Sequence, residues 1–217
     1  MLRIIGGKAQ SLSFNGYANS GAFSASYSFG GMSLGEVASD RLIVVCVANH
    51  SVNVPGRVTA MSVAGVSATR QGGAGPNPYS SIWSASVPTG TSGTISLSLA
   101  DKGTDMTIAV YSVYGLFSTT AYHVTTTHQI IGTGQLNLSV PNRGMAIVIA
   151  VQDSSVGGAK GVTWTYPELE LNPSGDLINA AGSVNTASRA GLPETPIFTV
   201  QATPASGDIT MVSTTWR

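Results

Sequence analysis

The chain has 217 residues, and only 9% of them are charged, against roughly 25% in an average soluble domain. Ten basic and ten acidic side chains leave a formal net charge of zero, which excludes nucleic-acid binding that depends on neutralising many phosphates. The hydrophobic content of 42% is enough to build a core. The longest apolar runs, Leu42–Ala48 and Met145–Val151, are far shorter than the roughly 20 residues of a membrane-spanning helix.

Residues 1–35 are predicted to form an N-terminal arm and a first strand. Phe23, Tyr27 and Phe29 occupy alternate positions with serines between them, and this period of two is typical of a half-buried strand. Phe14 and Tyr17 precede them among Gly, Asn and Ser. Phe14, Tyr17 and Phe23 are therefore candidate residues for contacts with neighbouring subunits.

Residues 36–217 are predicted to form a single all-β domain, an antiparallel β-sandwich of jelly-roll or immunoglobulin-like type with about eleven to thirteen strands. Continuous apolar runs at Leu42–Val47, Ile108–Val113 and Met145–Val151 indicate strands that are central in a packed sheet. Alternating runs at Ile95–Leu99 and Leu136–Val140 indicate half-buried strands.

Turn signals separate these strands. Pro88–Gly93 and Pro141–Gly144 each begin with proline and end with glycine, as hairpin connections do. Asp101–Asp105 is predicted to be a loop between two strands. The single cysteine, Cys46, lies within an apolar run, so no disulfide framework is expected.

One segment, Gly31-Met-Ser33-Leu-Gly35, matches the G-x-S-x-G pattern of a serine-hydrolase nucleophile elbow. That chemistry needs a helix directly after the serine, whereas the next strand begins at Leu42 and leaves no room for one. The pattern also arises readily by chance in a chain with 26 glycines and 28 serines. A loop is the favoured interpretation, a hydrolase using Ser33 is the alternative, and the protein is predicted not to be an enzyme.

Metal-binding patterns are weak. His123 and His128 lie five apart in a predicted strand, which directs them to opposite faces. Asp101 and Asp105 are interpreted as turn-forming residues, because a calcium site typically gathers more acids. Glu170 shares one face of an extended segment with Glu168, which fits an exposed strand edge better than a glycosidase pair. No metal and no cofactor are predicted.

Aromatic residues raise the possibility of carbohydrate binding. Trp83, Trp164 and Trp216 lie in alternating strands, where a core position is the default. Tyr79 follows the Gly- and Pro-rich loop that contains Asn77, and is the better candidate for a ring at the surface.

A hairpin followed by an apolar strand occupies the middle of the chain. Residues 81–99 read SIWSASVPTGTSGTISLSL, and residues 106–115 read MTIAVYSVYG. This arrangement resembles virion proteins of tailed bacteriophages and related prophages, in which a V-P-T-G-T-S-G-T hairpin precedes an apolar strand ending in an aromatic residue and glycine. The resemblance covers residues 40–155. It implies a structural role in the particle and brings no catalytic residues.

Lysine is rare, at Lys8, Lys102 and Lys160 alone. Because lysine commonly guards sheet edges against pairing with other chains, the edges of this protein are expected to be covered by neighbours in an assembly. The predicted function is a capsid decoration, or cement, protein that stabilises the head through contacts with the major capsid protein or other virion proteins. It is expected to be a homo-oligomer in the virion, made in the host cytoplasm without a signal peptide, with no membrane or nucleic-acid partner. The alternative is a receptor- or carbohydrate-binding module of a tail fibre or baseplate, in which Asn77 and Tyr79 bind a surface glycan.

Overall fold

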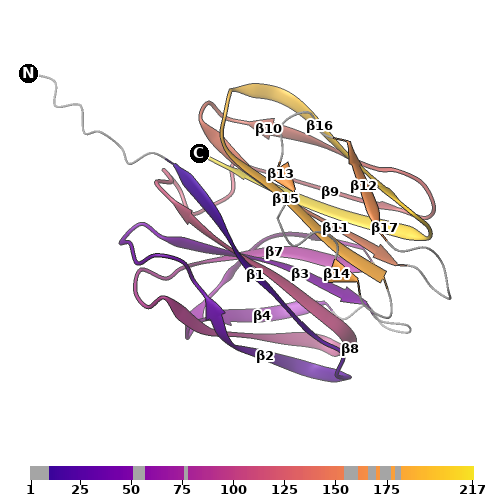
Figure 1. The fold of residues 1–217 in the computed structure, drawn as a ribbon, viewed down its shortest axis with the longest axis horizontal. Helices are drawn as coiled ribbons and strands as arrows, with labels where there is room; N and C mark the ends of the chain where they lie inside the picture. Colours follow the sequence, from indigo (N-terminus) through magenta and orange to yellow (C-terminus); the bar gives the residue numbers. More distant parts are fainter. Residues whose placement is uncertain are drawn as a thin grey trace, which may run out of the picture.

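The computed structural model describes residues 10–50, 57–75, 78–153, 161–165, 170–171, 177–178 and 182–217 (Figure 1). These residues form seventeen strands and no helix, so the described part of the chain has no helix that could cross a membrane. The prediction of an all-β, sandwich-like fold with antiparallel sheets is confirmed. The described strands outnumber the eleven to thirteen expected, partly because β5, β13 and β14 are two residues long and carry no periodic signal.

The N-terminal half is one eight-stranded sheet that folds over on itself at the long strand β8. Residues 92–103 of β8 pair with β2 and β4 in the outer part of this sheet, and residues 104–114 pair with β1 and β3 in the inner part. The strands are β1 (Ser11–Ser20), β2 (Ser24–Ser33), β3 (Leu42–His50), β4 (Val58–Val63), β5 (Val66–Ser67), β6 (Thr69–Ala74), β7 (Tyr79–Ser86) and β8 (Ser92–Tyr114).

The fold of this sheet lies at a bend within β8. Asp101–Asp105 is part of the continuous strand, so the prediction of a loop between two separate strands is wrong. Asp105 has a φ of 50°, in the left-handed region that redirects a chain. Gly103 lies against the Asn49 amide so closely that a Cβ there would overlap it. The bend therefore depends on a residue without a side chain.

The C-terminal half contains two further sheets. The inner one has the order β13-β15-β11-β17-β9, with β14 also paired to β15, and the outer one has the order β10-β16-β12. The strands are β9 (His123–Gln129), β10 (Gly134–Val140), β11 (Gly144–Asp153), β12 (Val162–Thr165), β13 (Glu170–Leu171), β14 (Leu177–Ile178), β15 (Gly182–Leu192), β16 (Thr195–Pro204) and β17 (Asp208–Trp216).

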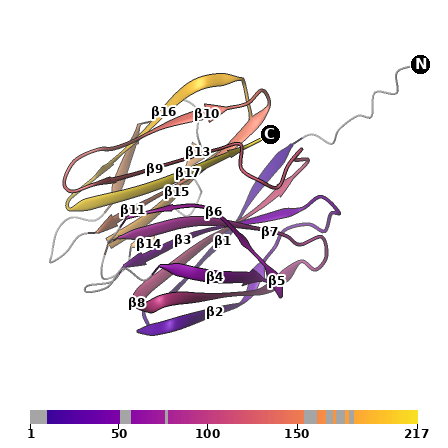
Figure 2. The ribbon, with the colours of Figure 1, turned by 180° about the vertical axis from the view of Figure 1, so that it is seen from behind.

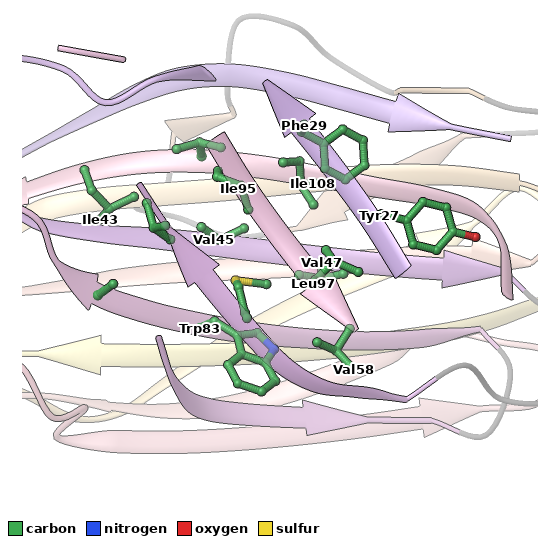
Figure 3. Close-up of a cluster of buried hydrophobic side chains, with 14 of the residues drawn as sticks. Tyr27, Phe29, Ile43, Val45, Val47, Val58, Trp83, Ile95, Leu97 and Ile108 are labelled. Carbon is green, nitrogen blue, oxygen red and sulfur yellow. The ribbon is translucent and has the colours of Figure 1, made fainter. Parts of the chain in front are cut away.

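Together the sheets make four layers with three apolar cores between them. Figures 1 and 2 show the indigo-to-magenta N-terminal strands on one side of the molecule and the orange-to-yellow C-terminal strands on the other. The first core lies between the two parts of the folded N-terminal sheet and includes Tyr27, Val45 and Trp83 (Figure 3). The second joins the two inner sheets, and the third fills the C-terminal sandwich.

The inner sheets are buried on both faces, which explains the continuous apolar runs. Along β3, Val45 packs in the first core, whereas the neighbouring Val44 and Cys46 pack in the second. Along β11, Ile147 packs in the second core and Val148 in the third. Because successive side chains point to opposite faces of a strand, a strand covered on both faces needs apolar residues at every position.

The N-terminal segment is more regular than an arm with one strand. Within its described residues it contains two strands, β1 and β2, and both pair with β8. Residues 1–9 lie outside the described ranges. The assignment of residues 36–217 to a single domain stays a prediction.

Candidate functional site

Phe14 and Tyr17, predicted to contact neighbouring subunits, lie at the margin of the second core. The Phe14 ring meets the Tyr17 ring at 4.8 Å and the Tyr111 ring at 5.4 Å, both in edge-on geometry. The Tyr17 hydroxyl lies 3.0 Å from Oγ1 of Thr186, within hydrogen-bond distance. These two rings therefore help to join the inner N-terminal sheet to the inner C-terminal sheet.

The other predicted contact residues have different environments. Phe23 is 66% exposed in the turn between β1 and β2, where the Lys102 ammonium lies 5.7 Å from its ring centroid. Asn77 lies outside the described residues. Tyr79 is only 2% exposed, so the expectation of a surface ring is wrong. Its place on β7, beside Asn49 of β3, directs the ring into the first core.

The three tryptophan rings lie in or against the apolar cores. Trp83 and Trp216 are buried in the first and second cores, as predicted. Trp164 is partly buried and packs against the third core. These three rings act in packing.

The segment around Ser33 forms no nucleophile elbow. Ser33 is the last residue of β2, and residues 34–41 form bends and a turn with no helix. The Ser33 hydroxyl accepts a long hydrogen bond of 3.5 Å from the Gly35 N–H. The geometry is that of a serine closing a loop.

Metal-ligating residues are dispersed. His123 and His128 occupy positions of opposite parity in β9, whose pairing with β17 has no register shift, so the prediction of opposite faces is confirmed. His128 Nδ1 lies 2.8 Å from Oγ1 of Thr210, and His123 Nδ1 accepts a hydrogen bond of 3.3 Å from the Ser139 N–H. No group of three or more His, Cys, Asp or Glu side chains converges within the described ranges.

The sheet edges are nearly free of charge. The edge strands are β1, β2, β5, β6, β9, β10, β12, β13 and β14. Within these described edges, Arg70 of β6 and Glu170 of β13 are the only charged residues. β2 is the clearest case, since it has ten uncharged residues and no described strand pairs with its second side. Such edges present unguarded backbone groups to another chain.

Uncharged polar side chains also lie in rows on the two outer faces. On the outer N-terminal face, Ser28, Ser96, Ser62 and Ser67 lie opposite one another across four strands. On the outer C-terminal face, amide and hydroxyl side chains are hydrogen-bonded across the strands. Gln201 Nε2 donates to Gln135 Oε1 at 3.0 Å, and Thr199 Oγ1 donates to Asn137 Oδ1 at 3.0 Å. Neither face repels a neutral neighbour.

Two isoleucines project from the tip between β9 and β10. Ile130 and Ile131 are 73% and 79% exposed. Ile131 has a φ of 66°, and a β-branched residue in the left-handed region is strained. The tip therefore exposes two large apolar side chains to solvent.

No protein-family model matches the chain, and no curated protein is significantly similar to it.

Proposed function

We propose that this protein is a structural component of a tailed-bacteriophage particle, a capsid decoration protein that binds between major capsid subunits. The observation that carries the proposal is the nearly complete absence of charge from the described edge strands, above all from β2. Long uncharged edges favour pairing with another chain, and natural proteins that stay monomeric usually block them. The resemblance of residues 81–115 to phage virion proteins supports the same function.

Two further features support binding to a protein partner. The exposed tip at Ile130 and Ile131 offers apolar area, and the hydroxyl- and amide-covered outer faces offer hydrogen bonds without a desolvation cost for charges. An interface built from these parts gains its affinity from buried area and backbone pairing.

The direct experiment is a cryo-EM map of the purified phage particle. Density that fits the four-layered chain on the head, between major capsid subunits, is the expected result. Absence of such density from both head and tail would overturn the proposal, and density on the tail would move the protein to another structural role.

An edge variant tests the observation itself. Ser28→Lys places a charge on β2 without touching a core, because Ser28 is exposed. We expect it to fold normally and to be incorporated into particles at a lower level than the wild type. Thr119→Lys, in the exposed loop after β8, is the matched control and should be incorporated normally. Equal incorporation of both variants would show that the β2 edge is not part of the interface.

If the protein is instead a carbohydrate-binding module, a residue other than Tyr79 must stack on the sugar. Because Tyr79 is buried, it cannot offer a ring face to a sugar. A glycan array and a host-cell adsorption assay test this alternative, and binding in both would favour it over a capsid role.

A further inference from the structure

One cavity in the N-terminal half collects positive charge. It has a volume of about 440 Å³ and is lined by Arg57, Arg70, Gly73, Ala74, Gly75 and Tyr79. Two of the chain's ten basic side chains thus face a single hollow. Its volume lies within the range of small-ligand sites.

The two guanidinium groups are not neutralised by the described residues. Arg70 lies 5.7 Å from the centroid of the Tyr79 ring, and neither it nor Arg57 forms an ion pair with a described carboxylate. The neighbouring segments 51–56 and 76–77 contain no acidic residue in their sequences. No described carboxylate therefore offsets the positive charge of this cavity.

A buried phenol also faces this cavity. The Tyr79 hydroxyl makes no hydrogen bond of ordinary geometry with a described residue, and the Ser81 hydroxyl beside it already accepts one from the Trp83 indole N–H. Burial raises the pKa of Tyr79, while Arg70, the Ser81 hydroxyl and Arg57 act in the opposite direction. The phenol is therefore protonated at neutral pH and has a proton to donate.

Gly73 keeps the space between these groups open. A Cβ at this position would overlap the Arg70 guanidinium and would lie 2.9 Å from the Tyr79 hydroxyl oxygen. The guanidinium and the phenol thus converge over a backbone without a side chain. Asn49, opposite Tyr79 across the strands, likewise has both amide atoms buried without a hydrogen bond to a described residue.

We propose that Arg57, Arg70 and Tyr79 form a binding site for one oxyanion, a carboxylate or phosphate group carried by a small ligand. Guanidinium groups match the geometry of both anions and form two parallel hydrogen bonds with them. The Tyr79 O–H donates a further bond, which satisfies a buried group that is otherwise unbonded. A neutral ligand of the same size leaves both arginines without a counter-charge.

The site is tested by titrating ligands into the full chain and monitoring the NMR signals of the Tyr79 ring. The probes are glucuronate, inorganic phosphate and, as a neutral match for glucuronate, glucose. We expect saturable shifts with at least one anion, weaker binding as salt is added, and no saturable shift with glucose. The glucuronate and phosphate titrations distinguish the two anions. No saturable shift with either anion, or equal binding of glucose, would overturn the proposal.

Variants assign the binding to these residues. Arg57→Gln and Arg70→Gln should each raise the dissociation constant of the anion by about tenfold or more, because each removes a charged hydrogen-bond donor. Arg70→Lys keeps the charge but loses the planar guanidinium group. Its affinity for the anion should lie between those of the wild type and Arg70→Gln. Arg143→Gln, at an exposed turn before β11, is the matched control. If Arg143→Gln weakened anion binding as much as Arg70→Gln, the loss would be explained by net charge alone, and the proposed site would be contradicted.

Discussion

Arg41 donates its Nε–H to the carbonyl oxygen of Val87 at 2.7 Å, and this bond joins two loops at one end of the folded N-terminal sheet. The Arg41 side chain is only 1% exposed and none of its hydrogen-bond partners is a carboxylate. Its other four hydrogen bonds also go to backbone carbonyls, those of Gly35, Glu36, Thr89 and Gly90. A buried cation is thus satisfied entirely by main-chain oxygens, and it holds together the loop after Ser33 and the hairpin before β8.

Replacement of Arg41 should be strongly destabilising. Arg41→Met leaves five carbonyl bonds unmade, and we expect the free energy of unfolding to fall by about 3–5 kcal/mol. Arg41→Lys should be intermediate, since an ammonium has three donors in place of five. Urea unfolding followed by tryptophan fluorescence measures both. Arg143→Met, at an exposed position, is the control and should change stability by less than about 0.5 kcal/mol.

The Cys46 thiol should be chemically silent in the folded protein. Burial raises the pKa of this thiol, and the side chain lies within the second core. Because the thiolate is the reactive form, iodoacetamide should label Cys46 only as fast as the protein unfolds. Mass spectrometry of samples quenched over time, at several urea concentrations, measures this rate. Rapid labelling under native conditions would contradict the double-sided burial of β3.

The four-layer arrangement makes both faces of an inner strand sensitive. Ile147→Ala removes volume from the second core and Val148→Ala from the third, so both should destabilise, by about 2–4 and about 2 kcal/mol. Ile130→Ala, at the exposed tip, is the control and should have little effect. In a two-layer sandwich one of the two β11 substitutions would be tolerated. Tolerance of Ile147→Ala would argue against stacking of the two halves, and tolerance of Val148→Ala would argue against the third core.

Local sequence patterns predicted the strands well where the pattern and the environment agree. Tyr27 and Phe29 alternate with serines because one face of β2 meets the first core and the other meets solvent. The run Met145–Val151 is apolar throughout because β11 is covered on both sides. Periodicity reports the number of buried faces, so these strands could be recognised without knowledge of the fold.

Long-range pairing decided the features that the sequence did not predict. The Asp and Gly residues of 101–105 are typical of a turn, yet they form a bend because β8 pairs on both sides of it, with β2 and β4 and then with β1 and β3. Tyr79 follows a Pro- and Gly-rich segment, but its pairing opposite Asn49 turns the ring inward. The cavity of Arg57 and Arg70 unites residues from separate strands and loops, for which no local signal exists.

Relief of strain at the tip should stabilise the fold. Ile131 has a φ of 66°, which glycine adopts without a steric penalty, and its side chain is exposed. Ile131→Gly should therefore raise the free energy of unfolding by about 0.5–1 kcal/mol despite the greater freedom of glycine in the unfolded chain. Ile130→Gly is the matched control, since Ile130 is not among the described residues with positive φ, and it should not stabilise. Thermal unfolding by calorimetry separates the two.

A pair of carboxylates should make stability depend on pH. Asp153 and Asp208 lie opposite each other on β11 and β17. Burial, and secondly the negative charge of Asp208, raise the pKa of Asp153 above its ordinary value. The folded state therefore holds the Asp153 proton more tightly than the unfolded state, and this contribution is complete below the unfolded pKa near about 4 and is lost as pH rises through the folded pKa.

Asp208→Asn tests this dependence by removing the neighbouring charge. The variant should be more stable than the wild type at about pH 7, by less than about 1 kcal/mol because both side chains are partly exposed. The difference should shrink as pH falls through the folded pKa of Asp153, because a protonated Asp153 carboxyl is no longer repelled by the charge beside it. Urea unfolding across this range measures the difference, and NMR titration should show a lower pKa for Asp153 in the variant. Asp101→Asn, at an exposed position on β8, is the control and should leave the Asp153 titration unchanged. If the variant is no more stable than the wild type at neutral pH and the pKa of Asp153 is unchanged, then Asp208 does not repel Asp153.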